Sequence, residues 1–228
     1  MSEWVDQKTD LAEQLARGEC GGGYGDAIVV LSSVISGIAA ALWPGDRIDR
    51  QRFVQAWWAY SDRTLAPVQV SVPLLIEHLD GEREFAAADA LRNRQPGMFM
   101  PRGLPDDLVT TGDRVDLTEE EVLGVTALPL RTLREFTYPN LFYRYFRSAY
   151  VHEARIGRHG DEIVMSETRG DITYACFFEK PRYRINFAIS WLASITRSIW
   201  SAAREEVRAR APLPLPDRWW LTGSTPSA

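Results

Sequence analysis

An arginine and a histidine stand close together in a strongly apolar and aromatic segment, residues 141–153. Four residues separate them in the run Arg147-Ser148-Ala149-Tyr150-Val151-His152. Histidine is scarce, because the chain has only three. An imidazole titrates near neutral pH and can shuttle protons. The planar guanidinium matches two phosphate oxygens at once. Together, these two residue types indicate cleavage of a phosphodiester without a metal ion.

This segment resembles the RxxxxH signature of the HEPN ribonuclease families. Those are small helical proteins of toxin–antitoxin modules, phage-defence systems and CRISPR effectors. The resemblance extends over residues 24–208, with a long apolar helix expected from Asp26 to Trp43 and a mixed helix from Tyr183 to Arg208. It implies an all-α, HEPN-like helical bundle with a small β-hairpin after the motif helix. It also implies a homodimer with paired motifs at its interface.

The resemblance also implies a role for each motif residue. His152 is expected to act as general base or acid at the 2′-hydroxyl or the leaving oxygen. Arg147 is expected to stabilise the phosphoryl charge in the transition state, and Ser148 to orient the histidine or the phosphate. Three further residues are expected to bind RNA: Arg144, Arg155 and Tyr150. The product is then a 2′,3′-cyclic phosphate, formed with no metal and no cofactor. The expected partners are RNA, a second copy of the chain and an antitoxin or defence complex.

Two alternatives stand beside this interpretation. Many family members carry Asn, Asp or His directly after the arginine, where this chain has Ser148. That departure favours a catalytically silent dimeric module that binds RNA or a partner protein. A purely structural motif would instead pair Arg147 with Glu153 and use His152 to cap a helix end, where cations are favourable. Tyr150 would then serve in core packing.

Helix geometry sets a condition on catalysis. On a regular helix, Arg147 and His152 point about 140° apart. The residues that share one face are Arg144, Ser148, His152 and Arg155. The two motif side chains can therefore cooperate only if the helix distorts near its end, before Gly157, or if two subunits bring their motifs together.

The charge distribution supports a nucleic-acid partner. The 228-residue chain has a net charge of −5, which argues against indiscriminate coating of nucleic acid. Between Arg131 and Arg158, however, six arginines face two glutamates, a local balance of +4. A focused basic patch suits a phosphate backbone. The alternative is a general preference for arginine, since Lys8 and Lys180 are the only lysines.

Composition also bounds the setting of the protein. Cys20 and Cys176 are too few for a disulfide framework and lack metal-ligand spacing, which indicates reduced, cytoplasmic thiols. The N-terminus shows no signal-peptide pattern. The uncharged run from Ala27 to Trp43 favours a buried core helix over a membrane span. Peripheral membrane attachment through this run is the remaining alternative.

The chain divides into three parts by pattern. Residues 1–23 form an N-terminal helix and a glycine-rich connector, 24–210 form the helical domain with a long loop insertion at 94–116, and 211–228 form a Pro-rich, Trp-containing tail. Pro139 is expected in the first turn of the motif helix, and Gly157 and Gly160 are expected to end it. Other predicted helices cover residues 4–17, 49–60, 72–79, 82–93, 118–126 and 128–136, and predicted strands cover 162–166 and 171–177.

Overall fold

The computed structural model describes residues 2–94, 109–162, 170–177, 182–209 and 213–214. These residues form mostly helices with one small antiparallel sheet, so the prediction of a mainly helical fold is confirmed. The expected two-stranded hairpin is instead a three-stranded sheet. The predicted tail at 211–228 lies outside the described residues apart from Leu213 and Pro214.

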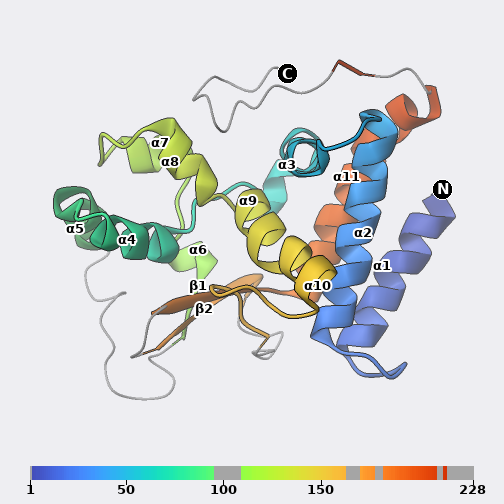
Figure 1. Ribbon diagram of the computed structural model, residues 1–228, viewed down its shortest axis with the longest axis horizontal. Coiled ribbons are helices and arrows are strands. Elements are labelled where there is room, and N and C mark those ends of the chain that lie inside the picture. The colour runs from blue at the N-terminus through green and yellow to red at the C-terminus, as the bar shows by residue number, and fades with distance from the viewer. Residues whose placement is uncertain (1, 95–108, 163–169, 178–181, 210–212, 215–228) are drawn as a thin grey trace.

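Three long helices run side by side on one flank of the molecule: α1 (Ser2–Ala16), α2 (Tyr24–Leu42) and α11 (Ile189–Ala209) (Figure 1). Among the described helices, α2 is long and apolar enough to cross a membrane. It packs against α1, α11 and the helix α3 (Asp49–Tyr60), and Leu31, Ile35 and Ile38 are fully buried. This packing agrees with a core helix. The helix begins at Tyr24, two residues before the expected Asp26, and the Asp26 carboxylate accepts the N–H of the N-cap residue Gly23 at 3.0 Å.

Shorter helices make up the opposite flank (Figure 1). The predicted helices are confirmed with small shifts in their bounds. Thr118 and Glu121 match the sequence pattern of a capping box, and the capping box is present at the start of α7, where it satisfies backbone amides. The helices of that flank are α4 (Val72–Gly81), α5 (Phe85–Arg94), α7 (Glu119–Leu123) and α8 (Leu130–Glu135). The helix α3 (Asp49–Tyr60) instead packs against α2 and α11, and the 3-10 turn η1 (Arg63–Leu65) follows it.

The sheet corrects two predictions. Its antiparallel order is β1 (Val109–Thr111), β2 (Ile172–Cys176), β3 (Tyr183–Phe187). The last helix therefore begins at Ile189, not at Tyr183. Residues 183–187 form a strand instead, and apolar and polar side chains alternate along them with the two-residue period of a strand. The expected loop at 94–116 contains β1 and the helical turn α6 (Gly112–Val115). Most of the strand expected at 162–166 lies outside the described residues.

Asp116, at the end of the expected loop, joins three elements. Its Oδ2 accepts the hydroxyls of Tyr138 and Tyr174, each at 2.6 Å, and its Oδ1 accepts the Val72 N–H at 3.0 Å. Burial raises the pKa of this carboxyl to about 7. The contacts hold the first turn of the motif helix against α4 and β2.

The motif helix is continuous but contains a π-helical turn. Its parts are α9 (Tyr138–Phe142), the π turn η3 (Tyr143–Arg147) and α10 (Ser148–Glu153), and Pro139 occupies the first turn as expected. The Ser148 N–H donates to the Tyr143 carbonyl, five residues back. The rings of Phe142 and Phe146 stack in the core at 5.7 Å. The distortion therefore lies in the turn that ends at Arg147, the first motif residue, and not near the helix end, which was one of the two ways considered for the motif residues to meet.

The chain then folds back over the π turn. Ala154, in the left-handed region, ends the helix, instead of the expected Gly157 and Gly160. The Gly157 N–H donates to the Tyr145 carbonyl at 2.7 Å. A Cβ on Gly157 would lie 2.8 Å from the Tyr145 backbone, so only glycine fits there. This contact fixes the return segment 154–161 against the motif helix.

Gly157→Ala should lower the free energy of unfolding by about 1–3 kcal/mol, because the methyl group must push two backbone segments apart. Urea denaturation followed by circular dichroism measures the change. The matched control is Gly81→Ala in α4, where a Cβ meets nothing within 4 Å and stability should stay within about 0.5 kcal/mol. Equal stability of both variants would contradict the close approach at Gly157.

Candidate nucleic-acid interface

Arg147 is held in an ion pair that the sequence did not reveal. Its Nη2 lies 2.6 Å from Oδ2 of Asp49, at the start of α3, and its side chain is only 15% exposed. The guanidinium also lies over the Tyr143 ring, 5.1 Å from its centroid. Glu153, the partner expected for a purely structural motif, pairs with Arg155 instead. Arg147 thus ties α3 to the motif helix.

Tyr143 completes this arrangement. Its hydroxyl donates to Asp49 Oδ2 at 2.9 Å, and the hydroxyl oxygen accepts from Arg147 Nη1 at 3.4 Å. Burial is the main cause that raises the pKa of Tyr143 to about 12, so the phenol remains a donor at neutral pH. The same carboxylate also pairs with Arg52, whose Nη2 lies 3.3 Å from Asp49 Oδ1. One carboxylate therefore receives a phenol and two guanidinium groups, and Arg147 is the closer of the two cations.

His152 lies on the exposed side of α10, in its last turn. Within the described parts of the chain its ring makes no hydrogen bond or ion pair. Because α10 is a regular α-helix, the five-residue step from Arg147 still turns the two side chains about 140° apart. The structure therefore does not bring Arg147 and His152 together within one chain.

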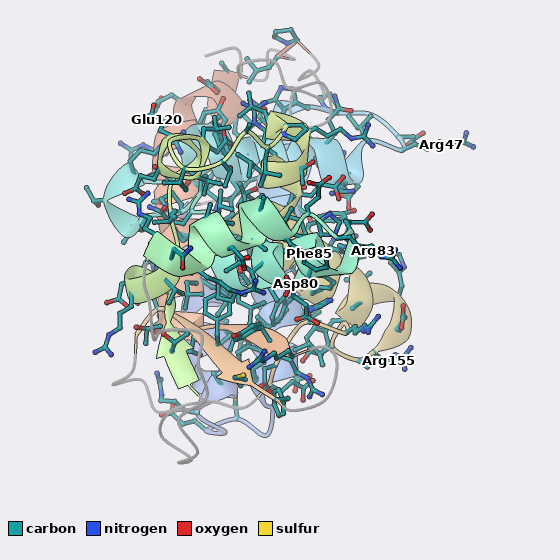
Figure 2. All side chains as sticks on the ribbon, turned by 90° about the vertical axis from the view of Figure 1, so that its left-hand side faces the viewer. Arg47, Asp80, Arg83, Phe85, Glu120 and Arg155 are labelled. Atoms are coloured by element: carbon teal, nitrogen blue, oxygen red, sulfur yellow. The ribbon has the colours of Figure 1, made fainter. Side chains whose placement is uncertain are left out.

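Three residues of the expected stripe do meet. Arg144, Ser148 and Arg155 line one pocket of about 430 Å³, whereas His152 does not line it. Arg155 stands at the rim of the molecule with its side chain 76% exposed (Figure 2). Its ion pair with Glu153 at 2.8 Å is exposed to solvent, and such pairs contribute little to the stability of the fold. Arg155 therefore remains available to an anion.

Tyr150 is engaged in packing. Its hydroxyl donates to Glu162 Oε1 at 2.5 Å. A Cβ on Gly25 of α2 would lie 2.7 Å from the Tyr150 ring, so the ring and α2 are in close contact. Burial raises the pKa of this phenol. These contacts favour core packing over the predicted stacking on a base.

A neighbouring pocket of about 280 Å³ gathers residues to which the sequence analysis gave no role. Arg144 lines this pocket too, together with Arg158, His159 and His78. Burial lowers the pKa of His159, and its Nδ1 lies 3.4 Å from the Tyr183 carbonyl oxygen. Arg158 and His159 follow the motif closely in the sequence, so their place near the motif helix could have been predicted. The approach of His78 from α4 was not visible in the sequence.

The arginines of this region differ in whether they form an ion pair. Neither Arg144 nor Arg158 forms an ion pair within the described part of the chain, in contrast to Arg147. A different cavity, of about 470 Å³, carries Asp113, Asp116 and Asp171 without a basic side chain among the residues that line it. The basic pockets on the motif helix therefore suit a phosphate, and the acidic cavity does not.

Metal ligands and thiols add no further site in the described residues, where no group of three His, Cys, Asp or Glu side chains could hold a metal ion. Cys20 and Cys176 are free thiols. Comparison with known proteins finds no matching protein-family model, curated protein or solved structure. The inference of function therefore depends on the geometry of the motif helix.

Arg147→Gln should lower the free energy of unfolding by about 1–3 kcal/mol, because the Asp49 carboxylate loses the closer of its two charged donors and keeps only Arg52. His152→Gln should change it by no more than about 0.5 kcal/mol, since the ring is exposed and unpaired. Parallel urea denaturation of both variants makes the comparison. Equal losses of stability would contradict the different placement of these two side chains.

Proposed function

We propose that the protein is a cytoplasmic, metal-independent endoribonuclease of the HEPN type that works as a homodimer. One observation carries the proposal. Arg144 on the motif helix and Arg158 on the return segment line one pocket, neither has a carboxylate partner among the described residues, and the same motif helix exposes His152. Unpaired guanidinium groups bind phosphate oxygens, and an accessible imidazole can move protons. These are the two capacities that RNA cleavage needs when no metal ion takes part.

The chemistry uses the 2′-hydroxyl of the substrate as the nucleophile. His152 accepts its proton, or donates one to the departing 5′-oxygen. The 2′-oxygen attacks phosphorus while the bond to the 5′-oxygen breaks, which leaves a 2′,3′-cyclic phosphate and a free 5′-hydroxyl. DNA lacks the nucleophile and is not cut. Arg147 stabilises the phosphoryl charge when it faces the substrate, and Ser148 orients the phosphate.

In this proposal, a second copy of the chain brings His152 and Arg147 together. Within one chain His152 and Arg147 face different directions, and Arg147 is paired with Asp49. An isologous dimer would set His152 of one protomer opposite the partner's Arg147. Val151, which is 47% exposed beside His152, offers an apolar contact for such an interface. The dimer would act as a toxin or defence effector, restrained by an antitoxin or by a defence complex.

The Arg147–Asp49 pair favours a second candidate function. An arginine that is already paired with a carboxylate is a weaker phosphate ligand. Ser148 also orients a phosphate more weakly than the amide, carboxylate or imidazole found at this position in the HEPN families. The protein would then be a silent dimeric module that binds RNA through Arg144 and Arg158. It would bind RNA at the same surface but would not cleave it.

Cleavage of cellular RNA in EDTA should fall by at least about 100-fold in His152→Ala and in Arg147→Ala. A mixture of the two variants separates the arrangements of the site. In a dimer whose sites combine His152 of one chain with Arg147 of the other, each mixed dimer keeps one intact site. Up to about a quarter of the wild-type rate should then return in a statistical mixture. Detection of 2′,3′-cyclic phosphate ends identifies the product.

The control variant is Arg204→Gln, an exposed arginine on α11, which should leave cleavage unchanged. Full activity in both His152→Ala and Arg147→Ala would contradict the proposed enzyme. Absence of rescue by the mixture would contradict the composite site. Tight RNA binding with no cleavage by the wild-type protein would establish the silent module instead.

A further inference from the structure

The 280 Å³ pocket beside the motif helix is built from three separate parts of the chain. Helix α4 contributes Glu77 and His78, and the π turn contributes Arg144 and Tyr145. The return segment after α10 contributes two more polar groups, Arg158 and His159. Two of the three histidines of the protein thus line one small cavity, although 81 positions separate them in the sequence.

The balance of charge in this pocket is positive. Arg144 and Arg158 have no carboxylate partner in the described chain, and the Arg144 guanidinium rests over the Tyr145 ring at 5.3 Å. Among the described residues that line the pocket, Glu77 is the one carboxylate. Its two oxygens accept the backbone amides of Arg182 and Tyr183, at 3.0 and 3.1 Å. Two guanidinium groups therefore share a space with a single carboxylate that is held by backbone amides, which leaves a net positive charge.

The His159 ring is oriented for a ligand. Its Nδ1 faces the Tyr183 carbonyl at 3.4 Å, and its ring lies 5.1 Å from that of Tyr145. If Nδ1 carries the proton toward that carbonyl, Nε2 is left for the pocket. Burial is the largest cause that lowers the pKa of His159. The Glu77 charge and the Tyr183 carbonyl oppose this shift, whereas the charges of Arg158 and Arg144 add to it. A bound anion would raise the pKa of His159 and favour the imidazolium.

Backbone contacts hold the pocket in place before any ligand arrives. The Ile185 N–H donates to the His159 carbonyl at 2.8 Å, and the Asp161 N–H donates to the Ile185 carbonyl at 2.9 Å. The Gly157 contact to Tyr145 fixes the other end of the return segment. Arg158 and His159 are thus carried by a segment attached both to β3 and to the motif helix, which lowers the ordering cost of binding.

We propose that this pocket binds a phosphate group, with Arg144 and Arg158 as its charged ligands and with His159 and His78 as hydrogen-bond donors. The shape and donors suit a compact tetrahedral anion. The adjoining 430 Å³ pocket shares Arg144, Tyr145 and Arg158 and adds Ser148 and Arg155. A nucleic-acid strand with one phosphate in the smaller pocket can therefore place its next phosphate in the larger pocket, along the motif helix.

The identity of the ligand as part of RNA rests on the proposed function, whereas the phosphate site itself does not. In the proposed enzyme this pocket would anchor one phosphate of the substrate away from the cleaved bond. His152 does not line it. Phosphate binding should therefore persist in His152→Ala, so failure of the phosphate site and failure of the ribonuclease can be told apart.

The test titrates inorganic phosphate into the full-length protein at constant ionic strength, while NMR follows the ring protons of the three histidines. The His159 resonance should shift and saturate, and its pKa should rise, while His152 stays unchanged as an internal control. Arg144→Gln and Arg158→Gln should each weaken phosphate binding by at least about tenfold. Arg204→Gln on α11 should leave it within about twofold.

Three results would overturn the site. These are an unchanged His159 resonance, equal shifts of all three histidines, and full binding by both arginine variants. Dinucleotides then identify the source of the phosphate. Tighter binding of pApA or ApAp than of ApA assigns the pocket to a terminal phosphate monoester. Equal binding of the three assigns it to a phosphodiester of the RNA backbone. Either result supports the phosphate site.

Discussion

The hydrogen bond from the Gly157 amide to the Tyr145 carbonyl is the constraint on which the candidate interface depends. It closes the return segment over the π turn, where no side chain larger than hydrogen fits. This closure sets Arg158 and His159 beside Arg144. Bonds to β3 hold the far end of the same segment. A local backbone contact thus converts a stretch of sequence into a basic, concave surface.

The arginines of the motif helix divide into two roles. Arg147 balances Asp49 and joins α3 to the helix, so its charge contributes to the fold. Arg144 and Arg158 have no such partner among the residues that the structure describes, and they line the pockets, so their charge is available to a ligand. The RxxxxH pattern lies on the helix that borders both basic pockets. Within a single chain, however, its arginine serves the architecture, and its histidine stands alone on the exposed side of α10.

Much of the fold could be predicted because it follows local rules. The long apolar run gave α2, and Thr118 with Glu121 gave a capping box. The strand at 183–187 was predicted as helix because it is only five residues long and lies directly before the strongly amphipathic α11. Its alternation of apolar and polar residues is too short to stand out from the helical pattern. The π turn was missed because one extra residue in a helix leaves no periodic signal. The meeting of His78 with His159 depends on tertiary packing, which a single sequence does not encode visibly.

The most direct test of RNA binding by Arg144 and Arg158 is the salt dependence of affinity for single-stranded RNA, measured by fluorescence anisotropy in the His152→Ala background. Each phosphate contact contributes about 0.7 to the slope of log K against log salt. Replacing both arginines with glutamine should therefore flatten the slope by about 1.4. The control pair Arg204→Gln and Arg208→Gln should leave it unchanged. Equal slopes for the wild-type arginines and the Arg144/Arg158 double variant would contradict phosphate binding at this surface.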